Sequence, residues 1–272
     1  MKKFFGIIGN PIKHSLSPVL HKYWFKKYAI DADYSIIETG DEKLSDVIKE
    51  IKQGNLSGIN VTLPFKQKII NHIDKIVNDA KLTGSINTLI LDDGSVVGEN
   101  TDVFGLQAAY LKKIDNDTNN KALIIGAGGV SPSVILSLYK SGIRQISIVN
   151  RTYDKCLFLK KNFNYLKILH WNNLQTEIGN YDIIINATSL GLKNGQDFDF
   201  NFSKCKNNAT YIDTIYNPLK TKTFKFLEDK GLKVFNGLDM FIYQGQKSFY
   251  LWNKINPEID DELVNLLLSK LK

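Results

Sequence analysis

The sequence predicts an α/β protein of two domains, and three observations carry this prediction. The chain has 272 residues, and at roughly 150 residues per domain this length corresponds to about two domains. Short apolar runs typical of strands alternate along the chain with amphipathic helical patterns, which is the order of βα units. In the second half these runs are almost continuously apolar, as expected for parallel strands that helices cover on both faces.

The first hundred residues contain the pattern of a complete α/β unit. Strands are expected at 4–9, 34–37, 58–62, 86–91 and 96–97, with a hairpin turn at 92–95 between the last two. One helix is expected to begin at Ser17, an N-cap residue type that Pro18 follows, and another at 63–66. The apolar stripe of a further helix is formed by Leu44, Val47, Ile48 and Ile51.

The second half repeats a strand followed by a helix. Strands are expected at 122–125, 145–149, 182–186, 211–213 and 234–235. Helical spacing follows the first of these strands as far as Tyr139 and returns at 154–161 and after Leu238. No internal repeat and no low-complexity linker interrupts this order.

Composition and charge exclude several classes of protein. A hydrophobic fraction of 43% and a charged fraction of 23% are those of a folded globular protein, which excludes disorder, collagen-like repeats and a disulfide scaffold. The formal charge of +7 would suit nucleic acid, a membrane surface or small anions. However, 33 lysines are scattered along the chain, only two arginines occur, and no five-residue basic block is present. We expect solvated helix faces and no nucleic-acid partner.

The cysteines and the apolar runs predict a cytoplasmic protein. Two cysteines without CxxC spacing indicate inert thiols in a reducing compartment, and no metal site is expected. The apolar run 4–9 is too short for a signal peptide, and Asn10-Pro11 interrupts it. No apolar stretch approaches the ~18–20 residues of a membrane span, so no membrane partner is expected.

A glycine-rich stretch predicts a dinucleotide site. Gly126-Ala127-Gly128-Gly129-Val130-Ser131 directly follows the strand 122–125 and precedes a helical pattern. In this context Gly126 permits a tight turn, Gly128 lets the backbone approach a pyrophosphate, and the helix N-terminus offers unpaired N–H groups. Ser131 stands where the GxGxxG pattern has its last glycine, a position that needs a small residue for packing of the helix on the strand. The alternative is an ordinary loop, but the order of strand, loop and helix favours dinucleotide binding.

The end of the next strand predicts NADP rather than NAD. An NAD-specific fold usually has an acidic residue there to bind the ribose 2′-hydroxyl, whereas this chain has Asn150-Arg151-Thr152. A guanidinium can hold a 2′-phosphate through two hydrogen bonds, and Lys155 would add a second positive charge. The alternative is a surface arginine at a strand end.

Polar residues also follow the predicted strands of the first half. They are Ser15, Ser17, Asn60, Thr62, Lys66, Asn87, Asn100, Thr101 and Asp102. Ligands of open α/β sheets bind beyond the carboxyl ends of the strands, so these side chains could converge on a ligand. Each also has a structural explanation as a cap, a turn residue or a solvated lysine.

Taken in order, these motifs resemble the shikimate dehydrogenases, and they span nearly the whole chain. The matching stretches are Ser15-Leu16-Ser17-Pro18, Asn60-Val61-Thr62-Leu63-Pro64-Phe65-Lys66, Gly84-Ser85-Ile86-Asn87-Thr88, Gly98-Glu99-Asn100-Thr101-Asp102, Gly126-Ala127-Gly128-Gly129, Asn150-Arg151-Thr152, Asn186-Ala187-Thr188-Ser189-Leu190-Gly191, Asp213 through Tyr216 to Pro218, and Gly237 through Met240 to Gln244. Two stretches depart from the family pattern. Ser131-Pro132-Ser133 replaces a more usual small-Arg-Ala stretch, and Phe241-Ile242 stands where Leu-Val is more frequent.

The resemblance implies reversible NADP-linked reduction of 3-dehydroshikimate to shikimate, a step in aromatic amino-acid biosynthesis. It implies Lys66 and Asp102 as the catalytic pair. The substrate residues that it implies are Ser15, Ser17, Asn60, Thr62, Asn87, Thr101, Tyr216 and Gln244. The cofactor residues are Gly126, Ala127, Gly128, Gly129, Asn150, Arg151, Thr152, Lys155, Thr188, Ser189, Gly237 and Met240.

The chemistry suits these residue types. Reduction of a ketone needs a proton at the developing alkoxide, and a lysine ammonium both stabilises that charge and supplies the proton. We expect Lys66 at a helix start, where the dipole disfavours its ammonium form, and Asp102 beside it, where the carboxylate favours that form. The first domain contains no arginine, so hydroxyls, amides or a lysine must bind the substrate carboxylate. Ser15 and Ser17 suit this role.

We therefore expect a three-layer α/β substrate domain, formed by residues 1–101 and 238–272, and a Rossmann-like NADP-binding domain at 102–237. A cleft that closes over the substrate should lie between them. The active form should be a monomer or a homodimer. One alternative is a quinate/shikimate dehydrogenase that uses NAD or both cofactors, against which Arg151 argues. Another is a non-catalytic dinucleotide-binding regulator, which would need neither Lys66 nor Asp102.

Overall fold

The chain folds into two compact units, each built on one six-stranded sheet. The structure, a computed structural model, describes residues 2–114, 119–192 and 196–271. Unit 1 comprises Met1–Asp102 and Gln244–Lys270, and unit 2 comprises Val103–Tyr243 and Leu271–Lys272. Within the described ranges, no helix is both long and apolar enough to cross a membrane.

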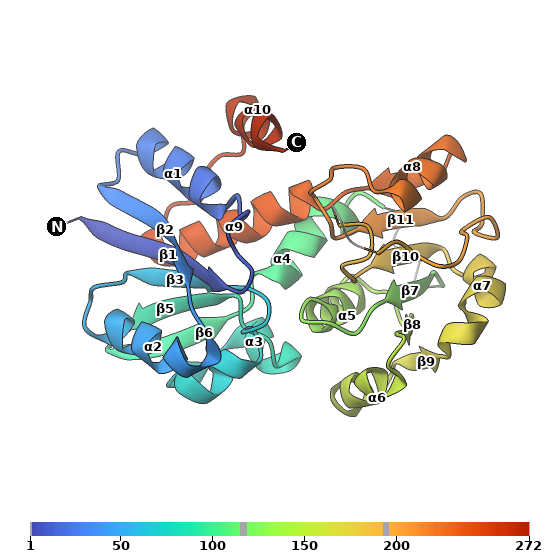
Figure 1. Ribbon diagram of the computed structural model, residues 1–272, viewed down its shortest axis with the longest axis horizontal. Coiled ribbons are helices and arrows are strands. Elements are labelled where there is room, and N and C mark those ends of the chain that lie inside the picture. The colour runs from blue at the N-terminus through green and yellow to red at the C-terminus, as the bar shows by residue number, and fades with distance from the viewer. Residues whose placement is uncertain (1, 115–118, 193–195, 272) are drawn as a thin grey trace. The chain divides into compact units, whose positions relative to one another are not determined.

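The sheet of unit 1 is mixed (Figure 1). Its strands are β1 (Lys3–Gly9), β2 (Ala32–Glu38), β3 (Gly58–Val61), β4 (Lys75–Ile76), β5 (Thr88–Asp92) and β6 (Ser95–Glu99), in the order β2-β1-β3-β5-β6-β4. β1 pairs in parallel with β2 and β3, whereas β5 is antiparallel to β3 and β6. The predicted hairpin turn is confirmed: Asp93 and Gly94 have φ of 46° and 74°, the positive values that a two-residue type I′ turn requires.

Helices cover both faces of this sheet, so unit 1 has three layers. Its helices are α1 (Ser17–Lys27), α2 (Leu44–Lys52), α3 (Asn78–Thr83), the C-terminal part of α9 (Leu238–Asn253), and α10 (Asp261–Lys270). The predicted apolar stripe of α2 packs with Ile8 and Ile59 on one face. On the other face, Phe5 of β1 contacts Phe25 of α1 and Trp252 of α9. Phe5 and Ile8 lie on opposite faces because side chains alternate along a strand.

The sheet of unit 2 is entirely parallel, as its apolar runs predicted. Its strands are β7 (Lys121–Ile125), β8 (Gln145–Val149), β9 (Lys167–Leu169), β10 (Ile183–Asn186), β11 (Thr210–Asp213) and β12 (Lys233–Phe235), in the order β12-β11-β10-β7-β8-β9. The central strand β7 is flanked by β8 and β10, so the strand order reverses at its carboxyl end. In open α/β sheets this reversal point is where ligands bind.

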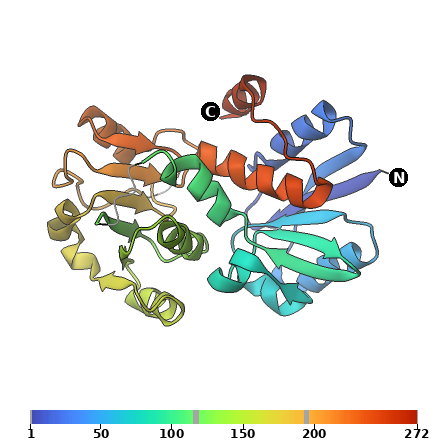
Figure 2. The ribbon, with the colours of Figure 1, turned by 180° about the vertical axis from the view of Figure 1, so that it is seen from behind.

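Two hydrophobic clusters cover the two faces of this sheet. The helices of unit 2 are α4 (Asp102–Leu106), which continues as a π-helix (Gln107–Leu111), α5 (Ser131–Lys140), α6 (Tyr153–Asn162), α7 (Leu174–Glu177), α8 (Lys222–Asp229) and the N-terminal part of α9. Ile124 packs with residues of α5 and α6, while its neighbour Leu123 packs with residues of α7 and α8. Figure 2 shows the same layers from behind.

Two local predictions were wrong. No helix begins at 63–66; a 3₁₀ helix begins only at Lys68 (Lys68–His72), because the Lys66 carbonyl, which a helix would use internally, accepts from Ile86 N at 2.8 Å. Ser17 is not the N-cap of α1 but its first residue. The hydroxyl next to its backbone is that of Ser15, which accepts from Ser17 N at 3.2 Å.

Candidate active site

Lys66 and Asp102 form a shielded ion pair in unit 1. Lys66 lies in the turns after β3, and Asp102, three residues after the end of β6, is the first residue of α4. Lys66 Nζ lies 2.6 Å from Asp102 Oδ2, and the two side chains are only 14% and 5% exposed. Removing both charges from water is costly, so such a pair persists where further hydrogen bonds satisfy the carboxylate.

Asn87 supplies that hydrogen bond and gathers the neighbouring side chains. Its amide nitrogen lies 2.9 Å from Asp102 Oδ1, 2.8 Å from Thr101 Oγ1 and 3.3 Å from Gln244 Oε1. Its amide oxygen accepts from Thr101 N at 2.7 Å. The structure thus brings Lys66, Asn87, Thr101, Asp102 and Gln244 into one cluster.

Asn60 links this cluster to Tyr34 and Ser248 through hydrogen bonds. Its amide oxygen accepts from Tyr34 Oη at 2.7 Å, and its amide nitrogen donates to the Asn87 carbonyl at 3.1 Å and to Ser248 Oγ at 3.0 Å. Asn60 is 4% exposed, so its amide atoms bond to protein groups and not to solvent. The sequence reasoning missed Tyr34 and Ser248. Ser248 lies four residues after Gln244, on the same face of α9, and this spacing was the available signal.

The paired serines connect to the same network. Ser15 Oγ donates to Ser17 Oγ at 3.2 Å. Burial holds the pKa of Tyr34 well above its ordinary value, and a hydrogen bond from Ser17 acts in the opposite direction. Tyr34 therefore stays a neutral hydroxyl between Ser17 and Asn60. Thr62 is half-buried, and its hydroxyl makes no hydrogen bond to any residue that the structure describes.

The glycine turn of unit 2 follows β7 and leads into α5. Gly126 has φ of 112°, and a Cβ there would lie 2.7 Å from Thr188 Cγ2. A Cβ at Gly128 would meet only the Ala187 carbonyl, at 3.9 Å, so the space in front of this residue is open to a ligand. Ser131 Oγ donates to the Gly126 carbonyl at 3.0 Å and accepts from Gly128 N at 2.9 Å. Ser131 thus does more than provide a small side chain, since it holds the turn closed.

Two exposed cationic side chains, Arg151 and Lys155, follow β8. Asn150 Oδ1 accepts from Ala127 N at 3.3 Å, which ties this strand end to the glycine turn. Arg151, Thr152 and Lys155 are exposed. With the residues that the structure describes, neither Arg151 nor Lys155 forms an ion pair. These groups and the open Gly128 backbone fit a phosphate-bearing dinucleotide.

The remaining predicted residues also lie in unit 2. Thr188 N and Oγ1 both bond to Asn186 Oδ1, at 3.0 and 2.7 Å, and Ser189 is exposed. Gly237 and Met240 are both buried. Tyr216, predicted to bind substrate, belongs to unit 2, whereas the other predicted substrate residues belong to unit 1. Its ring stacks on Phe241 with centroids 4.9 Å apart, so the unusual Phe241 has a packing partner.

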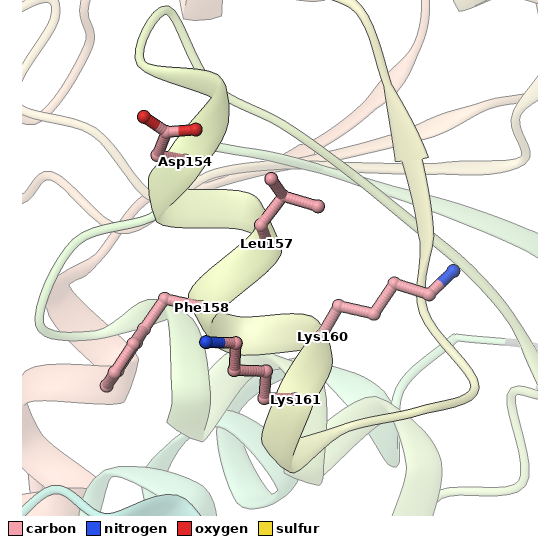
Figure 3. A pocket seen from close by; sticks show the side chains of 5 residues that line it. All are labelled: Asp154, Leu157, Phe158, Lys160 and Lys161. Atoms are coloured by element: carbon pink, nitrogen blue, oxygen red, sulfur yellow. The ribbon is translucent and has the colours of Figure 1, made fainter.

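An open hollow of about 520 Å³ lies elsewhere in unit 2, along α6. Figure 3 shows the five side chains that line it projecting from this helix: Asp154, Leu157, Phe158, Lys160 and Lys161. None of them is a predicted site residue, and none belongs to the networks above. Among the described residues, no group of His, Cys, Asp or Glu side chains could hold a metal ion.

Two family models match the chain. Residues 7–89 match the model of the shikimate dehydrogenase substrate binding domain. Residues 109–193 match the shikimate / quinate 5-dehydrogenase model. These ranges contain the turn with Lys66 and the glycine turn, respectively.

Relatives with known names match over the full length. The NADP(+) shikimate dehydrogenase of Pelagibacter ubique is 43% identical, over 98% of this chain and 99% of that protein. The crystal structure of a shikimate dehydrogenase in complex with NADP+ superposes with a TM-score of 0.92 at 33% identity, covering 100% of this chain and 96% of that one. The Thermus thermophilus enzyme, solved with NADP(H) and shikimate, gives a TM-score of 0.88 at 28% identity, covering 99% and 100%. The sequence motifs, both family models and these full-length relatives agree, and the chain belongs to the shikimate dehydrogenase family.

Proposed function

We propose that this chain catalyses the reversible NADP-linked reduction of 3-dehydroshikimate to shikimate. One observation carries the proposal at the level of residues: the shielded Lys66–Asp102 pair, 2.6 Å apart, with Asn87 on the second carboxylate oxygen. Curated relatives are named as NADP(+)-dependent shikimate dehydrogenases, and this pair is the arrangement that ketone reduction needs.

Lys66 acts as the general acid in ketone reduction and as the general base in the reverse direction. The nicotinamide, when bound, supplies or accepts the hydride. The Lys66 ammonium donates its proton to the oxygen that becomes the alkoxide, and such a positioned group contributes ~10²–10⁴ in rate. Asp102 orients the Lys66 side chain, because its carboxylate lies 2.6 Å from Lys66 Nζ and is itself held by Asn87.

Substrate recognition falls to hydroxyls and amides. We assign the substrate carboxylate to Ser15 and Ser17, because residues 1–101 contain no arginine. Asn87, Thr101 and Gln244 border Asp102 and would hold the ring. The other ring contacts that we propose are Thr62, Tyr216 and Asn60, the last acting through Asn87.

NADP binding falls to the glycine turn and to the end of β8. Gly126, Ala127, Gly128 and Gly129 would receive the pyrophosphate, and Arg151 with Lys155 would hold the 2′-phosphate. Asn150, Thr152, Thr188, Ser189, Gly237 and Met240 complete the proposed contacts. We assign substrate binding to residues 1–101 with 238–272, and NADP binding to 102–237.

The same observations weigh against the alternatives. Use of NAD, as in a quinate/shikimate dehydrogenase, would be favoured by an acidic side chain at residues 150–152, where Arg151 stands. A regulator that only binds a dinucleotide has no need of a shielded ammonium–carboxylate pair. We place the enzyme in the cytoplasm, because both of its thiols are free and buried, as in proteins of a reducing compartment. We expect it to act as a monomer or a homodimer.

A direct assay tests this proposal. Purified protein is mixed with shikimate and NADP+, and the absorbance of the reduced nicotinamide is followed; parallel reactions contain NAD+ or quinate. Turnover that prefers shikimate and NADP+ is expected. No reaction with shikimate and either cofactor would refute the proposal, and equal rates with NAD+ would refute the cofactor assignment.

A further inference from the structure

Asp213, at the end of β11, is a buried carboxylate that the proposed mechanism does not use. It is 1% exposed. Its Oδ1 accepts from Ile215 N at 3.0 Å and from Asn186 Nδ2 at 3.1 Å. Its Oδ2 accepts from Thr221 Oγ1 at 2.9 Å and from Tyr211 Oη at 3.3 Å. All four donors are neutral, and Asp213 forms no ion pair with the part of the chain that the structure describes.

A buried carboxyl group without a cation is costly, so its position calls for a physical reason. Burial raises the pKa of Asp213 to about 6, against the lowering effect of its hydrogen bonds. An apolar side chain would fill the same space without that desolvation cost. The carboxylate differs from an apolar side chain in that it fixes several donors at once, and these donors come from different segments of the chain.

One of these donors leads to the loop after β10. Asn186 ends β10 and lies opposite Asp213 in the parallel register. Its amide oxygen accepts from both Thr188 N and Thr188 Oγ1, and its amide nitrogen also donates to the Leu190 carbonyl at 3.1 Å. The Thr188 side chain in turn packs against Gly126, since a Cβ at Gly126 would lie only 2.7 Å from Thr188 Cγ2. Contacts therefore run from Asp213 through Asn186 and Thr188 to the glycine turn.

A second donor leads to the loop after β11. Ile215 N bonds to Asp213, and the next residue is Tyr216. Thr214 N and Oγ1 bond to the Asn186 carbonyl at 3.1 and 2.9 Å, which ties this loop back to the end of β10. Asp213 and Asn186 together thus set the start of both loops.

We propose that Asp213 is a positioning residue that acts with Asn186 to hold the Thr188–Ser189 loop against the glycine turn and to set the loop carrying Tyr216. It touches neither substrate nor cofactor itself. This inference rests on the proposed function, since it takes these loops to receive NADP. Its consequence is that loss of the Asp213 carboxylate weakens cofactor binding through residues that remain unchanged.

The variants that test this role are Asp213→Ala, Asp213→Asn and Asn186→Ala. An asparagine at 213 could keep its oxygen on Ile215 N and Asn186, and its nitrogen could donate to the Thr221 and Tyr211 hydroxyls, which also accept. Asp182→Ala is the matched control. Asp182 accepts from Lys121 N at 2.9 Å and from Lys206 Nζ at 2.6 Å. It lies just before β10 begins, at the amino ends of the strands, whereas Asp213 lies at their carboxyl ends.

The measurement is the dissociation constant for NADPH, from quenching of tryptophan fluorescence, alongside thermal unfolding. Asp213→Ala and Asn186→Ala should each weaken binding by about tenfold or more, since NADPH binding must then order the loops that these hydrogen bonds hold in place. Asp213→Asn should stay within about threefold of the original chain, since it keeps all four partners. Asp182→Ala should unfold at lower temperature but bind NADPH unchanged.

NADPH affinity unchanged in folded Asp213→Ala would overturn the proposal, as would an equal loss of affinity in Asp182→Ala. Should Asp213→Ala not fold, Asn186→Ala decides the question in the same way. Because binding is measured without turnover, a chain that binds NADPH but oxidises no shikimate would refute the proposed function and still decide the role of Asp213.

Discussion

Lys66 and Asn87 approach the Asp102 carboxylate from its two oxygens, with Lys66 Nζ 2.6 Å from Oδ2 and Asn87 Nδ2 2.9 Å from Oδ1. Two donors on two oxygens fix the plane of the carboxylate. The ammonium is thus held in one direction although its side chain is long and flexible. A proton donor requires fixed geometry of this kind, because it must lie within hydrogen-bonding distance of the acceptor before its pKa can matter.

Lys66→Ala should lower kcat by ~10²–10⁴ because the proton donor is lost, while the chain stays folded. Steady-state rates with shikimate and NADP+ and a thermal unfolding curve check both statements. Lys68→Ala is the control, since Lys68 lies two residues further on and, among the residues that the structure describes, pairs only with the exposed Asp41. Near-normal turnover in Lys66→Ala would contradict the assignment of Lys66.

Arg151→Ala should raise the Michaelis constant for NADP+ by about 10- to 100-fold, because a hydrogen bond to a charged group contributes ~1.5–3 kcal/mol. The constant for NAD+ should change little, since NAD+ lacks the 2′-phosphate. Arg144→Ala provides the control, because the other arginine of the chain stacks on Tyr139, 4.2 Å from its ring centroid. Equal effects of Arg151→Ala on both cofactors would rule out a contact with the 2′-phosphate.

Ser131→Ala should weaken NADP+ binding several-fold and lower the free energy of unfolding by ~1–3 kcal/mol, the cost of leaving a buried polar group without its partner. The reason is that Ser131 Oγ bridges Gly126 O and Gly128 N across the turn. Chemical denaturation and cofactor titration measure the two effects. Ser133→Ala, also buried in α5, is the comparison, and identical behaviour of the two variants would mean that the bridge has no special role.

The positions of the central strands of unit 2 were predictable from the sequence because these strands are buried on both faces. The short edge strand β9 is only partly buried and was not predicted. Runs such as Ile183–Asn186 cannot be read as amphipathic helices. The turn at Asp93-Gly94 was also predictable, since its residue types match the positive φ that a two-residue hairpin needs. The prediction of a helix at 63–66 was wrong because tertiary contacts outweighed the local residue types there. Local residue types suggested a helix there, but a tertiary hydrogen bond from Ile86 to the Lys66 carbonyl determined the backbone.

The residues of the site also divide into those that the sequence predicted and those that it did not. Motif order brought Lys66, Asn87 and Asp102 into one hypothesis because each lies beside a strand end of the same sheet. The residues behind them could not be inferred, because their contacts join distant parts of the chain: Ser248 reaches Asn60 from a helix 188 positions further on. Ser131 was expected only to be small, since nothing in a sequence shows that its hydroxyl closes the turn.

His21→Phe should reduce the loss of stability on acidification. His21 is fully buried, stacked on Tyr34 with ring centroids 4.6 Å apart, and burial lowers its pKa to about 3, outweighing the opposing effect of Asn60. Between pH 3 and 6.5 the unfolded chain therefore binds a proton that the folded chain does not, and stability falls as pH falls, by roughly 2–3 kcal/mol at pH 4.5 from this group. Phenylalanine keeps the stacking without the proton.

The measurement for His21→Phe is the free energy of unfolding by urea at pH 7 and at pH 4.5. The original chain should lose more stability between these two values than His21→Phe does, by ~2–3 kcal/mol, because only its unfolded state gains the His21 proton. His14→Phe is the control, since His14 is exposed and its replacement leaves the buried His21 ring in place. If the free energy of unfolding fell equally between pH 7 and pH 4.5 in the original chain and in His21→Phe, the buried imidazole would not limit stability in acid.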